Sequence, residues 1–445
     1  MNRSRREVVS WCLFDFANSA FTTVIVTTVF AVYFVKTVVP VSGSGLRGET
    51  LWSLCASASL VLSALLAPIL GALADERALK RALLIGSSLA CILATALLAT
   101  VGPGDVVRAM LLFIVANVGF EIGYVFYNGF LPEIAPPERA GRISGFGWAT
   151  GYIGGLLSLA VALVPLRFLL PAGATAEQTA AAARTCFLIV PVHFLIFALP
   201  AFLYLKDRPA GGAAPGPIAS RPPLDLVEPF RKVIRTLRTA RRYSEAFKFI
   251  LANLVYNDGL VTIFAFAGIF MNDVLKFTQA EIVLLVLVIN VPSAVGSFAF
   301  GFVNDRIGGK RTIMITLVIL IAAVLAMAAT APPAGASEAA IHRARAWFWA
   351  ISMLVGLGIG ANQSASRGLM ARLVPEGRHG EFFGFFIFSG KLASVFAPLT
   401  YGLVVQLTGS SVLAILSVTV FLVIGGAMLL LVNEAAGIRQ ARATG

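Results

Sequence analysis

The chain has 445 residues, of which 58% are hydrophobic and 13% are charged, whereas soluble domains carry about 25% charged residues. This composition excludes a conventional soluble enzyme, because 22 acids and 35 bases cannot cover the surface of the roughly two or three domains that a soluble chain of this length would form. The net charge of +13, which in a soluble protein suggests nucleic-acid binding, is better explained as an orientation signal beside anionic lipid.

Apolar stretches long enough to cross a bilayer, which takes about 20 helical residues, recur along the whole chain. The twelve predicted spans lie near residues 11–37, 50–74, 82–102, 107–130, 143–166, 184–205, 246–272, 281–303, 312–331, 346–368, 382–406 and 411–432. The first follows a basic start that resembles a signal peptide, but its apolar run is too long and contains Asp15 and Asn18. We therefore expect it to remain as the first helix of an all-α polytopic membrane protein.

The distribution of basic residues predicts how the chain is oriented. With twelve spans both termini share one side, and placing them in the cytoplasm puts the great majority of the 35 Lys and Arg residues there. We expect a multi-pass protein of the cell membrane with cytoplasmic termini and anionic lipids of the inner leaflet as partners. The four cysteines, Cys12, Cys55, Cys91 and Cys186, lie in apolar runs, so we expect buried thiols and neither a disulfide framework nor a metal or cofactor site.

One long polar stretch separates six predicted spans from the other six. It gives an N-terminal bundle (1–206), a linker (207–245) and a C-terminal bundle (246–445). Residues 208–223 are rich in Pro, Gly and Ala and are predicted to be disordered. A basic amphipathic segment follows, in which Leu226, Phe230, Val233, Ile234 and Leu237 recur at helical spacing opposite Arg231, Lys232, Arg235, Arg238 and Arg242. A helix lying on the inner leaflet and a solvated helix that closes the bundle both fit this pattern.

Two loop motifs occur twice, which predicts a duplicated six-helix unit. Gly71-x-x-x-Asp75-x-Arg77-x-x-Lys80-Arg81 matches Gly301-x-x-x-Asp305-Arg306-x-Gly308-x-Lys310-Arg311 at an offset of 230 positions. Pro136-x-x-Arg139-x-Gly141-x-x-x-Gly145 matches Pro375-x-x-Arg378-x-Gly380-x-x-x-Gly384 at an offset of 239. Parallel repeats are typical of transporters whose substrate site lies near the midplane between the halves, although a duplicated scaffold stays open.

Within the matched segments some charges change sign, because Glu133 aligns with Arg372 and Arg142 with Glu381. We therefore expect a cytoplasmic gating network of mixed charge in both halves. Its aspartates would accept hydrogen bonds from nearby helix N-termini. The candidate gating residues are Gly71, Asp75, Arg77, Glu133, Arg139, Gly301, Asp305, Arg306, Lys310, Arg311, Arg372, Arg378 and Glu381.

Polar residues follow one face of spans one, four, seven and ten, and an ionisable side chain at that depth is costly unless it faces water or a partner. The candidate cavity residues, with two more from spans five and eleven, are Asp15, Asn18, Asn117, Glu121, Tyr124, Asn128, Tyr152, Asn257, Asp258, Asn362, Gln363 and Lys391. Thr22 belongs to the face of span one, and Ser366 and Arg367 to that of span ten. Polar bonding between packed helices is the alternative.

Two of these residues have sharper hypotheses. Glu121 could exchange a proton, because burial raises the pKa of a carboxyl group toward the range where protonation can alternate with substrate binding. Lys391 lies too deep to reach water and could bind an anionic group of the substrate, or pair with Asp258 or Glu121 when the cavity is empty. A permanent ion pair that fixes the bundle is the alternative for Lys391, and Tyr152 is its repeat mate.

The loop from Gly301 to Arg311 resembles the signature loop of the major facilitator superfamily, and the resemblance extends over essentially the whole chain. The segments Trp11–Phe21, Gly147–Gly155 and Phe383–Lys391 resemble the UMF1 group, relatives of the fungal autophagy-linked vacuolar amino-acid effluxers. The first signature loop departs from the pattern at Glu76 and Ala78.

The resemblance implies a secondary transporter that moves a small polar solute, with amino acids as the candidate class, by alternating access. Spans one, four, seven and ten would line its cavity. It also implies a gate that holds the cytoplasmic side shut, no enzymatic activity and no nucleic-acid partner. A polytopic enzyme acting on a lipid-linked substrate and a non-transporting receptor are the alternatives. The sequence has no HExxH motif, Asp-rich repeat or P-loop that would favour the enzyme or an ATP-driven pump.

Overall fold

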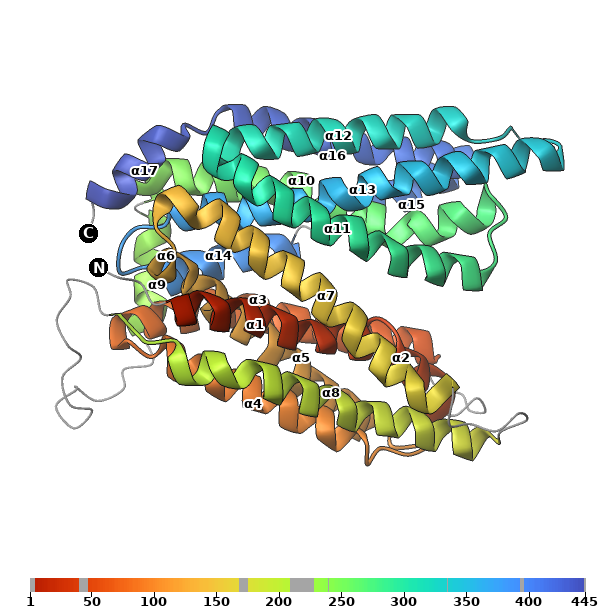
Figure 1. The fold of residues 1–445 in the computed structure, drawn as a ribbon, viewed down its shortest axis with the longest axis horizontal. Helices are drawn as coiled ribbons and strands as arrows, with labels where there is room; N and C mark the ends of the chain where they lie inside the picture. The colour runs from red at the N-terminus through yellow and green to blue at the C-terminus, as the bar shows by residue number, and fades with distance from the viewer. Residues whose placement is uncertain are drawn as a thin grey trace. The chain divides into compact units, whose positions relative to one another are not determined.

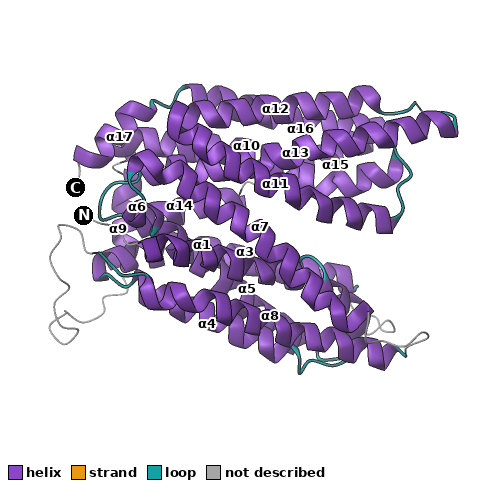
Figure 2. Ribbon diagram, viewed as in Figure 1, coloured by secondary structure: helices purple, strands orange, loops and turns teal. Residues whose placement is uncertain are grey.

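The computed structural model describes residues 5–39, 47–167, 175–208, 228–238, 240–333, 335–392 and 396–443. All the regular elements in these ranges are helices, as Figure 2 shows, and ten of them are long and apolar enough to cross a membrane. Two predicted spans are not among the ten. Span 246–272 corresponds to α10 (Ser244–Asp273), and span 382–406 is covered by α14 (His379–Leu392) and α15 (Phe396–Thr408). The predicted all-α class is confirmed.

The described contacts divide the chain into two compact units. Unit 1 comprises Met1–Ile134, Thr150–Val233 and Gly377–Gly384, and unit 2 comprises Ala135–Ala149, Ile234–Glu376 and Phe385–Gly445. The sequence halves 1–206 and 246–445 supply most of these units. A short segment of each half, the start of its fifth helix, packs within the other unit.

Unit 1 contains α3 (Gly48–Arg77), α4 (Lys80–Leu98), α5 (Val106–Gly129), α6 (Leu131–Ile134) and α8 (Ala176–Tyr204), together with the first span. Helix α5 packs against α3 and α4, and α8 packs against α1 (Arg5–Ala20) and α4 (Figure 1). The first span is interrupted by π-helical turns at Phe21–Val26 and Phe34–Val38, on either side of α2 (Val29–Tyr33). The continuous first helix that the sequence predicts is therefore irregular at its centre.

Unit 2 contains α10, α11 (Gln279–Ile307), α12 (Gly309–Thr330), α13 (Glu338–Leu373), α15, α16 (Ser411–Leu430) and α17 (Glu434–Ala443). Helix α13 packs against α11 and α12, and α16 packs against α10, α12 and α15. Helix α17 is short and packs on α13 and α10. Helix α7 (Ala140–Arg167) is divided at residue 149, with its first turns in unit 2 and the rest in unit 1.

The basic amphipathic segment forms α9 (Glu228–Arg238), as its spacing predicts. Val233 and Thr236 are buried, whereas Arg231, Arg235 and Arg238 are exposed. Of the stretch predicted to be disordered, only Arg208 is described, and the remaining residues lie outside the described ranges. The four cysteines are buried free thiols, as expected from their apolar surroundings.

Candidate functional site

Asp75, near the end of α3, accepts hydrogen bonds from the first turn of α14. Its carboxylate oxygens lie 2.9 Å from the backbone nitrogens of Gly380 and Glu381. These N–H groups have no acceptor within their own helix, and the positive end of the helix dipole favours a carboxylate there. The Asp75 side chain is completely buried, and Lys80 Nζ lies 3.7 Å from Asp75 Oδ1. We call Asp75, Lys80, Glu133, His379, Gly380 and Glu381 the first latch.

Lys80, Glu133 and His379 make a further set of polar contacts in the first latch. Lys80, the first residue of α4, forms an ion pair with Glu133, and both side chains are buried. His379 Nδ1 lies 3.2 Å from Glu133 Oε1. Burial lowers the pKa of His379 well below its usual range, and the nearby Lys80 ammonium lowers that pKa further. The first latch therefore holds its histidine neutral.

Glycines allow the first latch to close. A Cβ on Gly71 would collide with the carbonyl oxygen of Gly380, and a Cβ on Gly380 would lie 2.7 Å from that of Gly71. Gly384 lies equally close to Pro68, because a Cβ there would lie 2.7 Å from the Pro68 Cα. The start of α14 and the end of α3 therefore cross with their backbones in contact.

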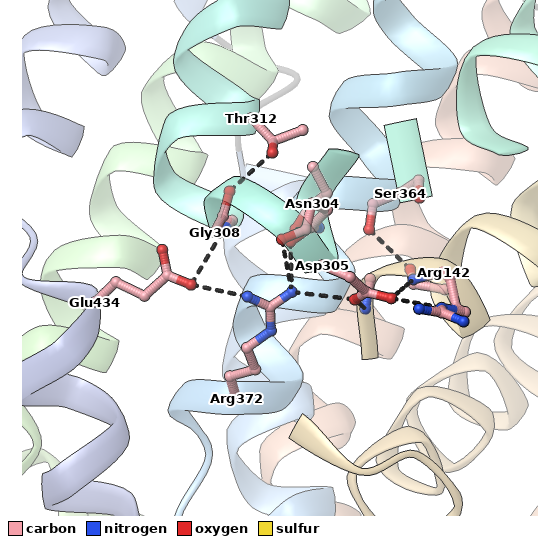
Figure 3. Close-up of polar contacts among 12 residues, drawn as sticks. Arg142, Asn304, Asp305, Gly308, Thr312, Ser364, Arg372 and Glu434 are labelled. Carbon is pink, nitrogen blue, oxygen red and sulfur yellow. Dashed lines mark hydrogen bonds and ion pairs between the residues drawn. The ribbon is translucent and has the colours of Figure 1, made fainter. Parts of the chain in front are cut away.

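Asp305, near the end of α11, makes the equivalent contact in unit 2 (Figure 3). Its Oδ1 lies 2.9 Å from the backbone nitrogen of Gly141, and its Oδ2 lies 2.9 Å from Arg142 Nε, at the start of α7. Arg372 on α13 lies 3.7 Å from Asp305 and also donates to the side chain of Asn304. We call Gly141, Arg142, Asn304, Asp305, Arg372 and Glu434 the second latch.

Glu434, the first residue of α17, completes the second latch. Its Oε1 lies 3.0 Å from Arg372 Nη1 and from the backbone nitrogen of Gly309, and its Oε2 lies 2.9 Å from the backbone nitrogen of Lys310. Lys310 Nζ in turn donates to the carbonyl oxygens of Leu430 and Val432, at 2.7 Å each. The start of α12 and the start of α17 are therefore joined through one carboxylate (Figure 3).

The two signature loops differ in backbone conformation, at the position where the first departs from the superfamily pattern. Gly308 has a φ of 91°, and its repeat mate Ala78 has φ 50° and ψ 50°. An alanine in this left-handed region costs about 1 kcal/mol relative to glycine. Both loops thus turn at a residue with positive φ, but Ala78 adopts the left-handed helical conformation and Gly308, with ψ 159°, does not.

The structure sorts the candidate gating residues into those in the latches and those outside them. Gly71, Asp75, Glu133 and Glu381 lie in or against the first latch, and Gly301, Asp305, Lys310 and Arg372 in or against the second. Arg378 lies 3.8 Å from Glu381. Arg139, Arg306 and Arg311 are exposed, and Arg77 is half-buried. Sequence reasoning missed His379 and Glu434, since neither has a charged repeat mate.

Several candidate cavity residues of unit 1 bond one helix to another. Tyr127 donates its hydroxyl to Asp15 Oδ2 at 2.9 Å, and Asn117 donates to Ser59 Oγ at 2.8 Å. Asn128 donates to the carbonyl of Tyr124 one turn earlier in α5, at 2.7 Å. Trp11 and Phe14 stack on Tyr127, whose hydroxyl binds Asp15, in an aromatic cluster that the sequence did not indicate.

Other candidates of unit 1 are buried or partly exposed. Glu121 is 4% exposed and Asn18 is 3% exposed. The Asn18 amide nitrogen has no hydrogen-bond partner among the described residues. Tyr124 stacks between Phe120 and Tyr127, and Tyr152 is partly exposed.

In unit 2 a chain of hydrogen bonds crosses three helices. Asn362 donates to Thr316 Oγ1 at 2.9 Å, Ser366 to Asn362 Oδ1 at 3.3 Å, and Tyr256 Oη lies 2.8 Å from Ser366 Oγ. These bonds join α10, α12 and α13, and the cavity lining stays a prediction. The other cavity candidates of unit 2 are Asn257, Asp258, Gln363 and Lys391. Asp258 is buried, Gln363 and Lys391 are partly exposed, and Asn257 lies 3.4 Å from the carbonyl oxygen of Gly390.

These features define a class of protein. The chain has duplicated halves, and the aspartate near the end of the second span of each half caps the start of the fifth span of the other half. Its family and its relatives identify it as a transporter of the major facilitator superfamily. The chain belongs to the family described as "Vacuole effluxer Atg22 like", whose match covers residues 35–442.

Among curated proteins, the chain is similar to "Uncharacterized MFS-type transporter YxiO" of Bacillus subtilis, with 29% identity over 98% of this chain and 96% of that protein. It is 25% identical to "Autophagy-related protein 22" of Yarrowia lipolytica over 60% of this chain and 46% of that protein, so the match spans about half of the fungal relative.

Among solved structures, the fold is similar to that of the proton:xylose symporter XylE (14% identity, 97% of this chain, 96% of that chain, TM-score 0.73). It is also similar to the E. coli fucose:proton symporter FucP (12% identity, 96% of this chain, 98% of that chain, TM-score 0.68). These likenesses agree with the predicted superfamily fold.

Proposed function

We propose that this protein moves a small polar solute across the cell membrane by alternating access, and that amino acids are the solute class. The observation that carries the proposal is the duplication of the latch, with a buried aspartate bonded to a helix start in each unit. A scaffold has no need of two equivalent ionic closures. In a transporter they stabilise one of two alternating states and can be broken in the other. The solute class comes from the resemblance of three segments to relatives of the vacuolar amino-acid effluxers.

In this proposal both latches lie on the cytoplasmic side and hold it shut, with both chain termini in the cytoplasm. Hydrogen bonds to a charged group contribute about 1.5–3 kcal/mol each, so a few of them suffice to bias a two-state equilibrium. Solute binding would release the latches by favouring the state in which they are broken. The polar faces of the first, fourth, seventh and tenth spans, with Tyr152 and Lys391, would contact the solute.

Glu121 is the proposed coupling site for a proton, because it is a buried carboxyl group at bilayer depth. Lys391 is the proposed contact for an anionic group of the solute. The exposed arginines of α9 would contact anionic lipids at the inner leaflet.

Counterflow in proteoliposomes tests the function, with labelled solute exchanged against a panel of amino acids, sugars and organic anions. We expect amino acids to support exchange and sugars to fail. Glu121→Gln should retain exchange but lose its response to a pH gradient, and Lys391→Met should weaken apparent affinity at least tenfold. Absence of exchange with every panel member would refute the proposed solute class, and an unchanged pH response in Glu121→Gln would exclude Glu121.

A further inference from the structure

Arg367 is a buried guanidinium that neither latch uses. It lies on α13, one turn after Asn362 and Gln363, and is 2% exposed. Its Nε donates to Ser144 Oγ at 3.0 Å, and its Nη2 donates to the Ser144 carbonyl oxygen at 2.7 Å. Ser144 belongs to the part of α7 that packs within unit 2. One residue of α7 therefore supplies two acceptors to one guanidinium.

The two Ser144 oxygens accept hydrogen bonds from the Arg367 guanidinium at the edge where a carboxylate would bind. The Nε and Nη2 donors point the same way, and the parallel pair of bonds that they form is the arrangement in which arginine binds the two oxygens of a carboxylate. Here both acceptors at this edge are neutral. A carboxylate would form the same two hydrogen bonds and would add the attraction between opposite charges, which the Ser144 oxygens do not supply. A carboxylate that reached this edge would therefore displace Ser144.

The contact with Arg367 fixes the start of α7. Ser144 Oγ donates to the carbonyl oxygen of Ser364 at 2.8 Å, and the Trp148 ring lies 5.2 Å from the Arg367 guanidinium carbon. A Cβ on Gly145 would lie 3.1 Å from the Cα of Gly301, so the same turns of α7 also pack tightly against α11. Release of Arg367 from Ser144 would remove two of the three hydrogen bonds that Ser144 makes with α13 in the described part of the chain.

We propose that Arg367 binds the carboxylate of the transported solute, and that the exchange of Ser144 for this carboxylate frees the start of α7 when the gate opens. The inference rests on the proposed transport function and narrows it to solutes that carry a carboxylate. Arg367 is then a specificity-determining residue. Ser144 is a positioning residue that holds the guanidinium in the closed state.

The contact between Arg367 and Ser144 is not repeated in the other half of the sequence. At the offset of 239 positions that relates the second pair of loops, Arg367 aligns with Asn128 and Ser144 with Phe383. Asn128 donates within its own helix. The arginine and its serine therefore belong to one half only, unlike the aspartates of the latches, which both halves share.

Paired solutes test the proposal. Exchange of alanine and leucine is compared with exchange of alaninamide and leucinamide, which keep the amine and side chain but lose the carboxylate. We expect the parent to prefer the acids at least tenfold, Arg367→Gln to lose this preference, and Arg367→Lys to recover it only partly, since lysine lacks the paired donors. Ser144→Ala should lower the KM for the acids, because one competing acceptor is gone. Arg439→Gln, an exposed arginine of α17, is the matched control.

Trp148 provides a readout that a merely structural role of Arg367 would not change. Acids should change the Trp148 emission as the guanidinium leaves the ring, amides should not, and Trp148→Phe should abolish the signal. If Arg367→Gln does not fold, the KM of Ser144→Ala for the acids and the fluorescence titration of the parent still test the proposal. Parent exchange of amides equal to that of acids, or an acid preference retained in Arg367→Gln, would overturn the proposal. Failure of the parent to exchange any of these four solutes would instead count against the proposed amino-acid class.

Discussion

Lys80 and Arg372 each lie beside a latch aspartate and also pair with a second acid, and they come from different positions of the repeat. Lys80 begins α4 and pairs with Glu133, whereas Arg372 occupies the position on α13 that aligns with Glu133 and pairs with Glu434. Each unit thus places a base between its aspartate and a second acid, and in unit 2 Arg142 is a further base beside Asp305. Although the charge changes sign between the aligned positions Glu133 and Arg372, both units keep the order of aspartate, base and second acid.

Neutralising one latch aspartate should release that latch. Asp305→Asn removes the charge that Arg142 and Arg372 face, which costs the closed state about 1.5–3 kcal/mol and shifts the equilibrium roughly tenfold or more. A cysteine introduced at Ser364, completely buried in the structure, should react at least tenfold faster with a thiol reagent added from the cytoplasmic side. Arg306→Gln, an exposed arginine next in sequence, should leave the rate unchanged. Equal rates in Asp305→Asn and the parent would contradict the role of this latch.

His379 makes the first latch sensitive to pH. Its pKa is lowered in the closed state by burial and then by Lys80, and Glu133 Oε1 lies 3.2 Å from its Nδ1. A lowered histidine pKa means that the open state binds the proton more tightly. The closed state is therefore fully stabilised above the ordinary histidine pKa of about 6.5 and loses stability as the pH falls below it.

Acidifying the cytoplasmic side from about pH 7.5 to 5.5 should accordingly speed the labelling of a cysteine introduced at Ala67, a buried position beside Gly384. His379→Gln should remove this pH step, because glutamine does not titrate. The second latch contains no histidine among its named residues. Labelling at Ser364→Cys in the His379→Gln background should therefore not depend on pH, and it is the reference for the labelling at Ala67→Cys. A pH step that persists in His379→Gln would exclude this histidine as its origin.

At the scale of helices, each latch depends on a crossing that only glycine permits. Gly71→Ala would drive a Cβ into the carbonyl of Gly380, and such overpacking costs about 1–3 kcal/mol. Because the clash exists only while the first latch is closed, we expect faster labelling at Ala67→Cys without loss of folded protein. Gly86→Ala on α4 is the matched control, since a Cβ there meets no atom within 4 Å. Equal labelling rates in Gly71→Ala and Gly86→Ala would show that the crossing of α3 and α14 can accommodate the added methyl group.

The helices could be predicted from sequence because a bilayer imposes a length and an apolar composition on every span. The latch aspartates could also be predicted, since their motifs recur at a constant offset. The partners could not. Glu434 follows the last span and reaches Arg372 only through tertiary packing, and His379 aligns with an alanine in the other half. The π-helical turns of the first span could not be predicted either, because a Thr-rich sequence does not indicate which backbone hydrogen bonds it will form.

At the scale of the whole molecule, α7 and α14 begin in one unit and come from the sequence half that forms most of the other. Each latch therefore lies inside one unit, but on a helix whose sequence continues into the other. If transport is a single two-state transition, as we propose, any change that breaks one latch must raise the population in which both are broken. Independent opening would instead confine the effect to one unit.

Asp75→Asn distinguishes these cases. In a concerted transition it should increase labelling not only at Ala67→Cys in unit 1 but also at Ser364→Cys in unit 2, by similar factors. Because the two aspartates belong to separate latches in different units, the double variant Asp75→Asn/Asp305→Asn should show the product of the single effects. The exposed-arginine variant Arg139→Gln serves as the control in both labelling backgrounds. Faster labelling at Ala67→Cys alone would mean that the first latch opens locally, and the two latches would then be separate gates rather than parts of one alternating movement.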